Sequence, residues 1–258
     1  MSGDLAARLV PAFVDAGLDR PVNGFQTAAN GCAEPIRESQ TMEPDLQTLR
    51  AAVVAFGGAG DRSWAALAEA TAPALNPLRP VHRRALRIWL NAWGCRLRYP
   101  RAGEPDPFDL GLARWWRWRG AALVGSDGRL ARLTDEQIGY AAECYADLAA
   151  LPIALGNGAR SLGPTAASKL LYALRPAALM PWDAAIAKHL HGARDSAAYA
   201  RHLRLGRDWA LRILAEGGGD EAKDEAALAD ALGQPGRTLA KMLDDYCYLE
   251  ITRERRPA

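Results

Sequence analysis

The segment Ser161-Leu-Gly-Pro-Thr-Ala-Ala167 and the later tripeptide Pro181-Trp-Asp183 carry the residues of this chain that are best suited to chemistry. The first is a glycine-containing turn that opens a helix, and the second places a lone acid at the start of the next helix. Glycine tolerates the backbone angles of such a turn, and the N–H groups at a helix N-terminus bind phosphate. We therefore expect the Asp183 carboxylate to lie beside a phosphate-sized site.

A carboxylate held at Asp183 suits two kinds of reaction. Breaking an N-glycosidic bond builds positive charge on the sugar, and a fixed carboxylate stabilises that charge or activates water. The same group could deprotonate an amine or a hydroxyl of a small substrate. Asp183 is also a typical N-cap for a helix over residues 184–191, and the two roles are compatible.

The stretch from Ser161 to Leu190 resembles the helix-hairpin-helix and the following helix of the HhH-GPD DNA glycosylase superfamily. Ser161-Leu-Gly163 stands where that family has its Gly-hydrophobe-Gly hairpin, and Asp183 stands where it keeps an aspartate. The resemblance implies an all-α fold, DNA as partner and catalysis by Asp183. It also implies that Ser161, Gly163 and Thr165 contact the substrate.

Two positions depart from the family pattern. Ser161 replaces the first hairpin glycine, which weakens the turn that presents N–H groups to a DNA phosphate. Thr165 stands where lyase-competent members have a Schiff-base lysine, and Lys169, one helical turn further on, is expected to point elsewhere. The resemblance therefore implies a monofunctional N-glycosylase that acts on a flipped, altered base without a cofactor.

Other residues are candidates for the same site. Trp182 is expected either to line a pocket beside Asp183 or to pack in the core. Asp45 could supply a second catalytic acid, as could Glu43, although N-capping alone accounts for Asp45. Two arginines could bind substrate if their helix lies beside Asp183, and otherwise belong to a solvated helix face. They are Arg83 and Arg87, within a group that also contains Arg79, His82 and Arg84.

Two alternatives to the glycosylase remain open. The first is a glycosylase-like scaffold reused for small-molecule chemistry in a bacterial natural-product pathway. There Asp183 or Asp45 acts as a base and arginines hold an anionic leaving group, as a ring closure such as aziridine formation requires. The second is a non-catalytic DNA-binding module. The glycosylase is the leading interpretation, but the departure at Ser161 and the net charge of +2 keep the first alternative close to it, because a DNA-binding surface is usually strongly basic.

Helical spacing of apolar residues dominates the chain and predicts an all-α fold. The chain is expected to have two regions. Residues 1–45 form a partly irregular N-terminal extension with a short helix over 4–18, and residues 46–258 form an all-helical, HhH-GPD-like region. Asp45, Asp61 and the capping box Thr134-Asp-Glu-Gln137 predict the starts of three helices. Those helices cover 46–56, 62–72 and 135–150, and others are predicted over 80–98, 108–119, 164–175, 183–191, 196–215, 224–232 and 236–246. The tail over 246–252 has the pattern of a short strand.

Two further motifs have simple interpretations. Arg114-Trp-Trp-Arg-Trp-Arg119 could stack on nucleic acid, but Trp115 and Trp118 share a helix face, which favours core packing flanked by solvated arginines. His189 and His191 are two residues apart and lie on different helix faces, so we expect no metal there.

Composition bounds the remaining properties. The four cysteines are scattered without a CxxC pair and are expected to be reduced thiols in a cytoplasmic protein. They are Cys32, Cys95, Cys144 and Cys247. No segment approaches about 18 uninterrupted apolar residues, so we expect no membrane partner. DNA and a small-molecule substrate remain the candidate partners, and the sequence identifies no protein partner.

Overall fold

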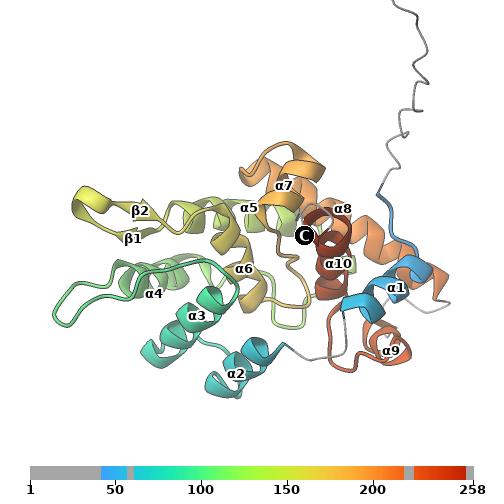
Figure 1. Ribbon diagram of the computed structural model, residues 1–258, viewed down its shortest axis with the longest axis horizontal. Helices are drawn as coiled ribbons and strands as arrows, with labels where there is room; N and C mark the ends of the chain where they lie inside the picture. Colours follow the sequence, from blue (N-terminus) through green and yellow to red (C-terminus); the bar gives the residue numbers. More distant parts are fainter. Residues whose placement is uncertain (1–41, 57–60, 218–223, 254–258) are drawn as a thin grey trace, which may run out of the picture. The chain divides into compact units, whose positions relative to one another are not determined.

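The computed structural model describes residues 42–56, 61–217 and 224–253 (Figure 1). The helix predicted over 4–18 and most of the predicted N-terminal extension lie outside the described residues, as does Cys32. The residues from Met42 onward form one unit. Its described part is mostly helical, with only two short strands, which confirms the all-α class.

Capping side chains fix where several helices begin. The Asp45 carboxylate accepts the Thr48 N–H at 2.7 Å at the start of α1 (Leu46–Phe56). Asp61 caps α2 (Arg62–Ala70) in the same way, and Thr134 forms a complete capping box with Gln137 at the start of α5 (Asp135–Ala150). These three predicted starts are confirmed, because each side chain satisfies amides that the first turn leaves without a partner.

The other elements follow the predicted order with shifted ends. They are α3 (Pro80–Ala92), α4 (Pro107–Arg119), α6 (Pro164–Leu174), α7 (Ala184–His191), α8 (Ser196–Glu216), α9 (Asp224–Ala231) and α10 (Leu239–Cys247). Two short strands, β1 (Pro152–Ala154) and β2 (Arg160–Ser161), pair antiparallel between α5 and α6. Single turns are η1 (Leu130–Arg132), η2 (Gly156–Gly158) and the π-helix η3 (Tyr248–Arg253).

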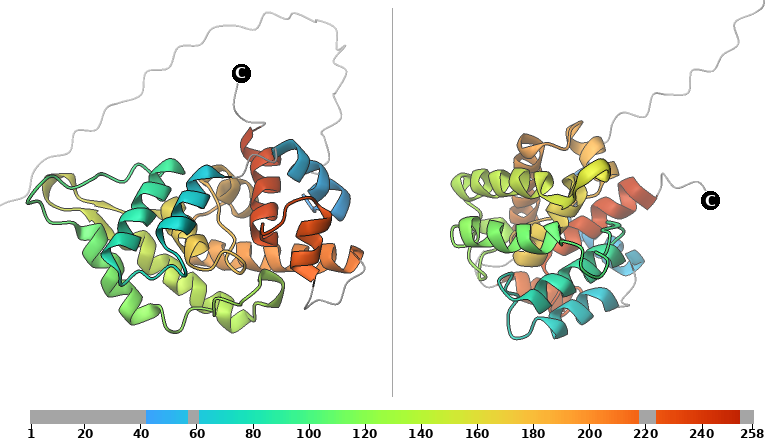
Figure 2. Two further views of the ribbon diagram at one scale, coloured as in Figure 1. Left: turned by 90° about the horizontal axis from the view of Figure 1, so that it is seen from below. Right: turned by 90° about the vertical axis from the view of Figure 1, so that its left-hand side faces the viewer.

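The core lies where α5, α6 and α8 meet. Helix α5 packs against α6 and α8, while α6 also contacts α3 and α10 contacts α1 (Figure 1). Helix α4 lies beside α5 and β1, at the end of the unit that carries the β-hairpin (Figure 2). Among the largest fully buried side chains are Trp89, Trp182 and Trp209. None of the described helices is long and apolar enough to cross a membrane.

Three predictions about elements are wrong. The tail forms η3 instead of a strand, continuing from the end of α10. Helix α3 stops at Ala92 rather than at residue 98, because Gly94 takes φ +77° and ends the helix in a Schellman motif. Trp118 is 68% exposed whereas Trp115 is 4% exposed, so the expected core packing holds for Trp115 alone. The Trp118 ring instead lies 4.2 Å from the Arg119 guanidinium carbon.

Candidate functional site

A cavity of about 740 Å³ lies where the start of α2, the end of α3, α6, α7, α10 and η3 converge. It takes side chains from positions between Phe56 and Thr252, so that segments far apart in sequence build one site. Eight of its lining residues are charged. These are Asp61, Arg62, Lys169, Asp183, Arg237, Lys241, Asp244 and Asp245.

Asp183 reaches this cavity from the N-cap position of α7. Its Oδ1 accepts the N–H groups of Ala185 and Ile186, both at 2.8 Å, which confirms that it caps the helix. Its Oδ2 accepts the hydroxyl of Thr252 at 2.9 Å. The side chain therefore has the cap role and lines a cavity at the same time, and catalysis by Asp183 stays a prediction.

The backbone just before Asp183 is fixed from two neighbouring helices. The Ser168 hydroxyl on α6 donates to the Trp182 carbonyl at 3.1 Å. His202 on α8 lies with its Nε2 3.2 Å from the Pro181 carbonyl, and only the imidazole can donate in that bond. Trp182 itself is 1% exposed and lines the cavity, so both expectations for this residue, core packing and pocket lining, hold together.

Lys169 lies in the same cavity as Asp183, so the expectation that it points elsewhere is wrong. Its Nζ donates to the Trp93 carbonyl at 2.7 Å and lies 5.5 Å from the centre of the Trp93 ring. Trp93 is the C-cap of α3, where carbonyl groups lack helical partners and the helix dipole attracts a cation. The packing of α6 on α3 therefore directs the lysine, and no local sequence signal reports that packing.

A charge-balanced cluster forms one wall of the cavity. Lys241 donates to Asp244 at 2.9 Å and also to Asp245, which in turn pairs with Arg237. Asp245 is 1% exposed. Burial raises the pKa of the Asp244 carboxyl, and Lys241 opposes that shift. Two cations thus face two acids, which makes the buried charges tolerable.

Aromatic rings form another wall. The Phe56 ring lies 5.4 Å from the Arg237 guanidinium carbon and 5.3 Å from the Lys241 ammonium nitrogen. Tyr248 meets Phe56 edge to face at a centroid distance of 6.0 Å. Trp93 also lines the cavity, with its ring stacked on Tyr172. A flat or apolar part of a ligand could pack on these faces.

A histidine pair adjoins Trp182, and sequence reasoning missed it. His191 Nε2 lies 3.1 Å from His202 Nδ1. Because His202 donates from Nε2 to a carbonyl, its Nδ1 accepts from His191 when both rings are neutral. Burial lowers the pKa of His191 to about 4 and that of His202 to about 3. The residues are on different helices, and only the crossing of α7 and α8 brings them together.

Arg83 and Arg87 lie in a different cavity, of about 460 Å³. Arg83 makes two bonds to Asp109, at 2.8 and 2.6 Å, and Arg87 bonds to Asp106. Each arginine is only 6% exposed, so the expectation of a solvated helix face is wrong for both. Pairing to acids on and beside α4, bidentate for Arg83 and through Nη2 alone for Arg87, neutralises both arginines and joins α3 to α4.

The two other predicted acids also lie away from Asp183. Asp45 is exposed at the start of α1, where bonds from Thr48 lower the pKa of its carboxyl. Glu43 pairs with Arg212 at 2.8 Å. Neither acid is among the described residues that line the cavity of Asp183.

In the segment expected to form a DNA-binding hairpin, most backbone N–H groups are not free to bind a phosphate. Gly163 takes φ +80° as the N-cap of α6, and its N–H donates to the Ala149 carbonyl at 3.0 Å. The Leu162 N–H donates to Leu151 at 2.8 Å, and Pro164 has no N–H. Ser161 is exposed on β2. Thr165 lies half-buried in the first turn of α6.

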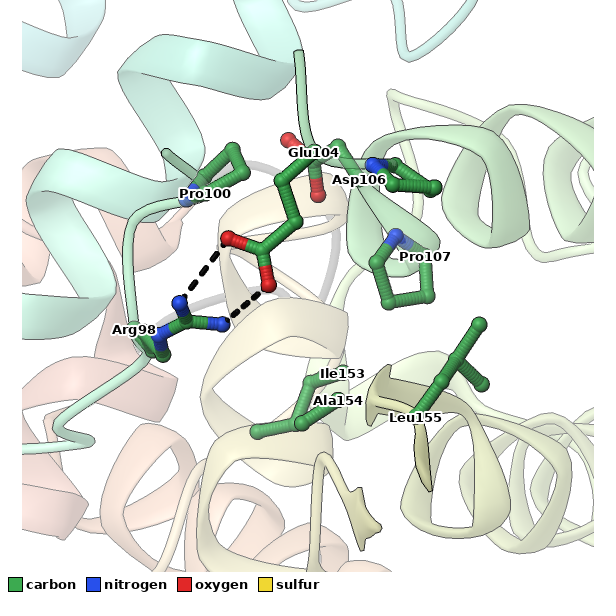
Figure 3. Close-up of a pocket in the computed structure, with 9 residues that line it drawn as sticks. Arg98, Pro100, Glu104, Asp106, Pro107, Ile153, Ala154 and Leu155 are labelled. Carbon is green, nitrogen blue, oxygen red and sulfur yellow. Dashed lines mark hydrogen bonds and ion pairs between the residues drawn. The ribbon is translucent and has the colours of Figure 1, made fainter. Parts of the chain in front are cut away.

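A small cavity of about 90 Å³ lies next to β1, apart from these residues. Arg98 and Glu104 pair across one side of it at 2.6 and 2.8 Å, while Ile153, Ala154 and Leu155 close the other side (Figure 3). This volume is well below the roughly 300 Å³ of a typical ligand pocket.

Among the described residues, no group of three or more His, Cys, Asp or Glu side chains could hold a metal ion. Cys95, Cys144 and Cys247 are free thiols, and burial raises the pKa of each. No protein-family model, no curated protein and no solved structure matches this chain.

Proposed function

We propose that this protein is an enzyme that acts on a small molecule bound in the cavity of Asp183. The observation that carries the proposal is that Asp183 and Lys169 line one cavity and each keeps unused hydrogen-bonding capacity. The volume of about 740 Å³ is within the range of small-molecule sites.

Asp183 has one acceptor position left for a ligand. A carboxylate accepts about four hydrogen bonds. Three are made by the two α7 amides and by Thr252. The remaining position suits a single N–H or O–H of a substrate, which is the group that a general base deprotonates.

Lys169 supplies the complementary positive charge. Its ammonium has three donors, and one bonds to Trp93. No described carboxylate lies within ion-pair distance of it, whereas Lys241 and Arg237 are each paired with acids. A ligand with an acidic group at Lys169 and an N–H or O–H at Asp183 would satisfy both residues.

This arrangement suits an intramolecular displacement. Asp183 takes the proton of an amine or hydroxyl, and the freed nitrogen or oxygen attacks a carbon of the same molecule. The bond from that carbon to an anionic leaving group breaks as the new bond forms, and the leaving group keeps the electron pair. Lys169 stabilises the charge that develops on it. Ring closure, for example to an aziridine, belongs to this class.

The glycosylase alternative draws support from the aromatic wall. A flipped base could stack on Trp93, Phe56 or Tyr248 beside Asp183. Two observations argue against the glycosylase, because a duplex needs several free donors and cations for its phosphates. The N–H groups of Leu162 and Gly163 donate to carbonyls of the protein itself. Arg83 and Arg87 of α3 are neutralised by ion pairs.

The test is to titrate the full chain with inorganic phosphate and sulfate and follow the thermal midpoint. We expect either anion to raise the midpoint of the wild type and Lys169→Met to weaken binding about tenfold. Lys188→Met, at an exposed lysine of α7, is the matched control and should bind as the wild type does. Equal binding by both variants would contradict the proposal.

The same protein should be titrated with matched DNA duplexes, with and without an abasic analogue. A small-molecule enzyme shows no preference for the analogue at any salt concentration. A clear preference would favour the glycosylase instead.

A further inference from the structure

The hydroxyl of Thr252 is the contact at Asp183 that comes from furthest along the chain. It donates to Oδ2 at 2.9 Å from the last turn of the described residues. The other oxygen of the carboxylate is already held by two amides of α7 itself. Thr252 therefore acts on the oxygen that remains for a ligand.

The turn that presents Thr252 is held on three sides. Ile251 is 1% exposed in the core, Tyr248 packs edge to face on Phe56, and η3 contacts α7 directly. The N–H of Tyr248 also bonds to carbonyls of α10, so the π-helix continues from that helix without a break. Single-turn π segments often occur at functional sites because they redirect the side chains that follow.

We infer that Thr252 is a positioning residue for Asp183. The inference rests on the proposed function for its chemistry, because it concerns the base of that reaction. The hydroxyl fixes the plane of the carboxylate, so that the last acceptor position of Oδ2 has one direction. A base that is oriented before the substrate arrives needs no rearrangement.

The test is the position of the Asp183 carboxyl ¹³C signal in the full chain at one fixed, neutral pH, assigned with Asp183→Asn. Thr252→Val keeps the shape of the side chain and removes the donor. We expect the Asp183 signal to move away from its wild-type position in this variant, because the carboxylate loses one hydrogen bond. Thr252→Ser keeps the hydroxyl and should restore the wild-type position.

Thr238→Val serves as the matched control. Thr238 caps α10 and donates to the Pro176 carbonyl, so its replacement costs stability without touching Asp183. A role limited to packing would lower the thermal midpoint of Thr252→Val and leave the Asp183 carboxyl signal at its wild-type position, and that result overturns the inference. Should Thr252→Val not fold, Thr252→Ala and Thr252→Ser allow the same comparison. None of these measurements uses a substrate, so they fail or succeed independently of the Lys169 test.

Discussion

The two carboxylate oxygens of Asp183 make different contacts. One oxygen caps α7 and the other faces Thr252 and the cavity. The sequence predicted the cap from residue type and position alone. It could not predict the second contact, because Thr252 meets Asp183 only after α10 and η3 have folded back.

Replacing Asp183 by Asn separates the helix-capping role of the residue from its proposed role as a base. Asn caps helices nearly as well as Asp, and its amide can donate to the Thr252 oxygen. We expect the free energy of unfolding to change by less than about 0.5 kcal/mol, while Asp183→Ala loses about 1 kcal/mol. Turnover should be abolished in both variants because neither has a base. Thermal unfolding and turnover check this, and an active Asp183→Asn would remove the residue from the mechanism.

The histidine pair gives the protein a pH-dependent stability. Burial lowers the pKa of His191 to about 4 and that of His202 to about 3, so both rings are neutral in the folded state at pH 7. As the pH falls below about 6.5, the unfolded chain binds protons that the folded chain does not. The free energy of unfolding due to this pair therefore falls as the pH drops from about 6.5 toward 4.

His202→Gln should remove part of this dependence. The Gln amide can still donate to the Pro181 carbonyl, but it does not titrate. Between pH 6 and pH 4 we expect the unfolding free energy to fall less steeply than in the wild type, by up to about 1.4 kcal/mol per pH unit. Urea unfolding across this range measures the slope. An unchanged slope would contradict the prediction, and His189→Gln, at an exposed histidine of α7, is the control.

At the scale of elements, helix starts were more predictable than helix ends. Asp61 and Thr134 satisfy amides of their own first turns, so their signal is local. Gly94 is a similar local signal for the end of α3, but the helical spacing of apolar residues continues past it, and the predicted helix over 80–98 was therefore too long. The π-helix at the C-terminal end of α10 has no such signal, since its conformation follows from packing on α1 and α7.

Gly94→Ala tests the end of α3. Its φ of +77° is strained for an L-residue, although a new Cβ would meet nothing within 4 Å. We expect a loss of about 1–2 kcal/mol in unfolding free energy. Gly139→Ala is the matched comparison, because Gly139 lies inside α5 with equally open space and helical angles, and should stabilise by about 0.5–1 kcal/mol. The denaturant midpoints of the two variants measure these changes in stability. If Gly94→Ala and Gly139→Ala changed the midpoint equally, the role of Gly94 in ending α3 would be refuted.

At the scale of the whole molecule, the sequence predicted the all-α class because helical periodicity is repeated in almost every segment. It did not predict which segments converge. Lys169 and Thr252 reach the cavity through contacts between helices, whereas Arg83 and Arg87 were drawn into ion pairs with α4. Residue type predicts which chemistry a side chain can perform, but long-range packing determines which site that side chain reaches.

Net charge leads to a prediction for DNA. The chain carries +2, and several of its arginines are paired internally. A glycosylase with about four phosphate contacts would give a slope near −3.6 in a plot of log affinity against log salt. We expect weak binding and a slope shallower than about −2, measured by fluorescence anisotropy on a duplex over several salt concentrations. A slope near the glycosylase value would restore DNA as the partner.

The cluster of Arg237, Lys241, Asp244 and Asp245 limits how this protein can diverge. The four charges balance, so removing any one member leaves an excess buried charge, and breaking a buried pair destabilises a protein by about 3–5 kcal/mol. That wall of the cavity can therefore change only by coordinated substitutions. Arg62, exposed at the rim, has no such constraint. In homologues that use a new substrate, we expect rim residues such as Arg62 to change first. The four charged residues of the cluster should be kept or replaced together.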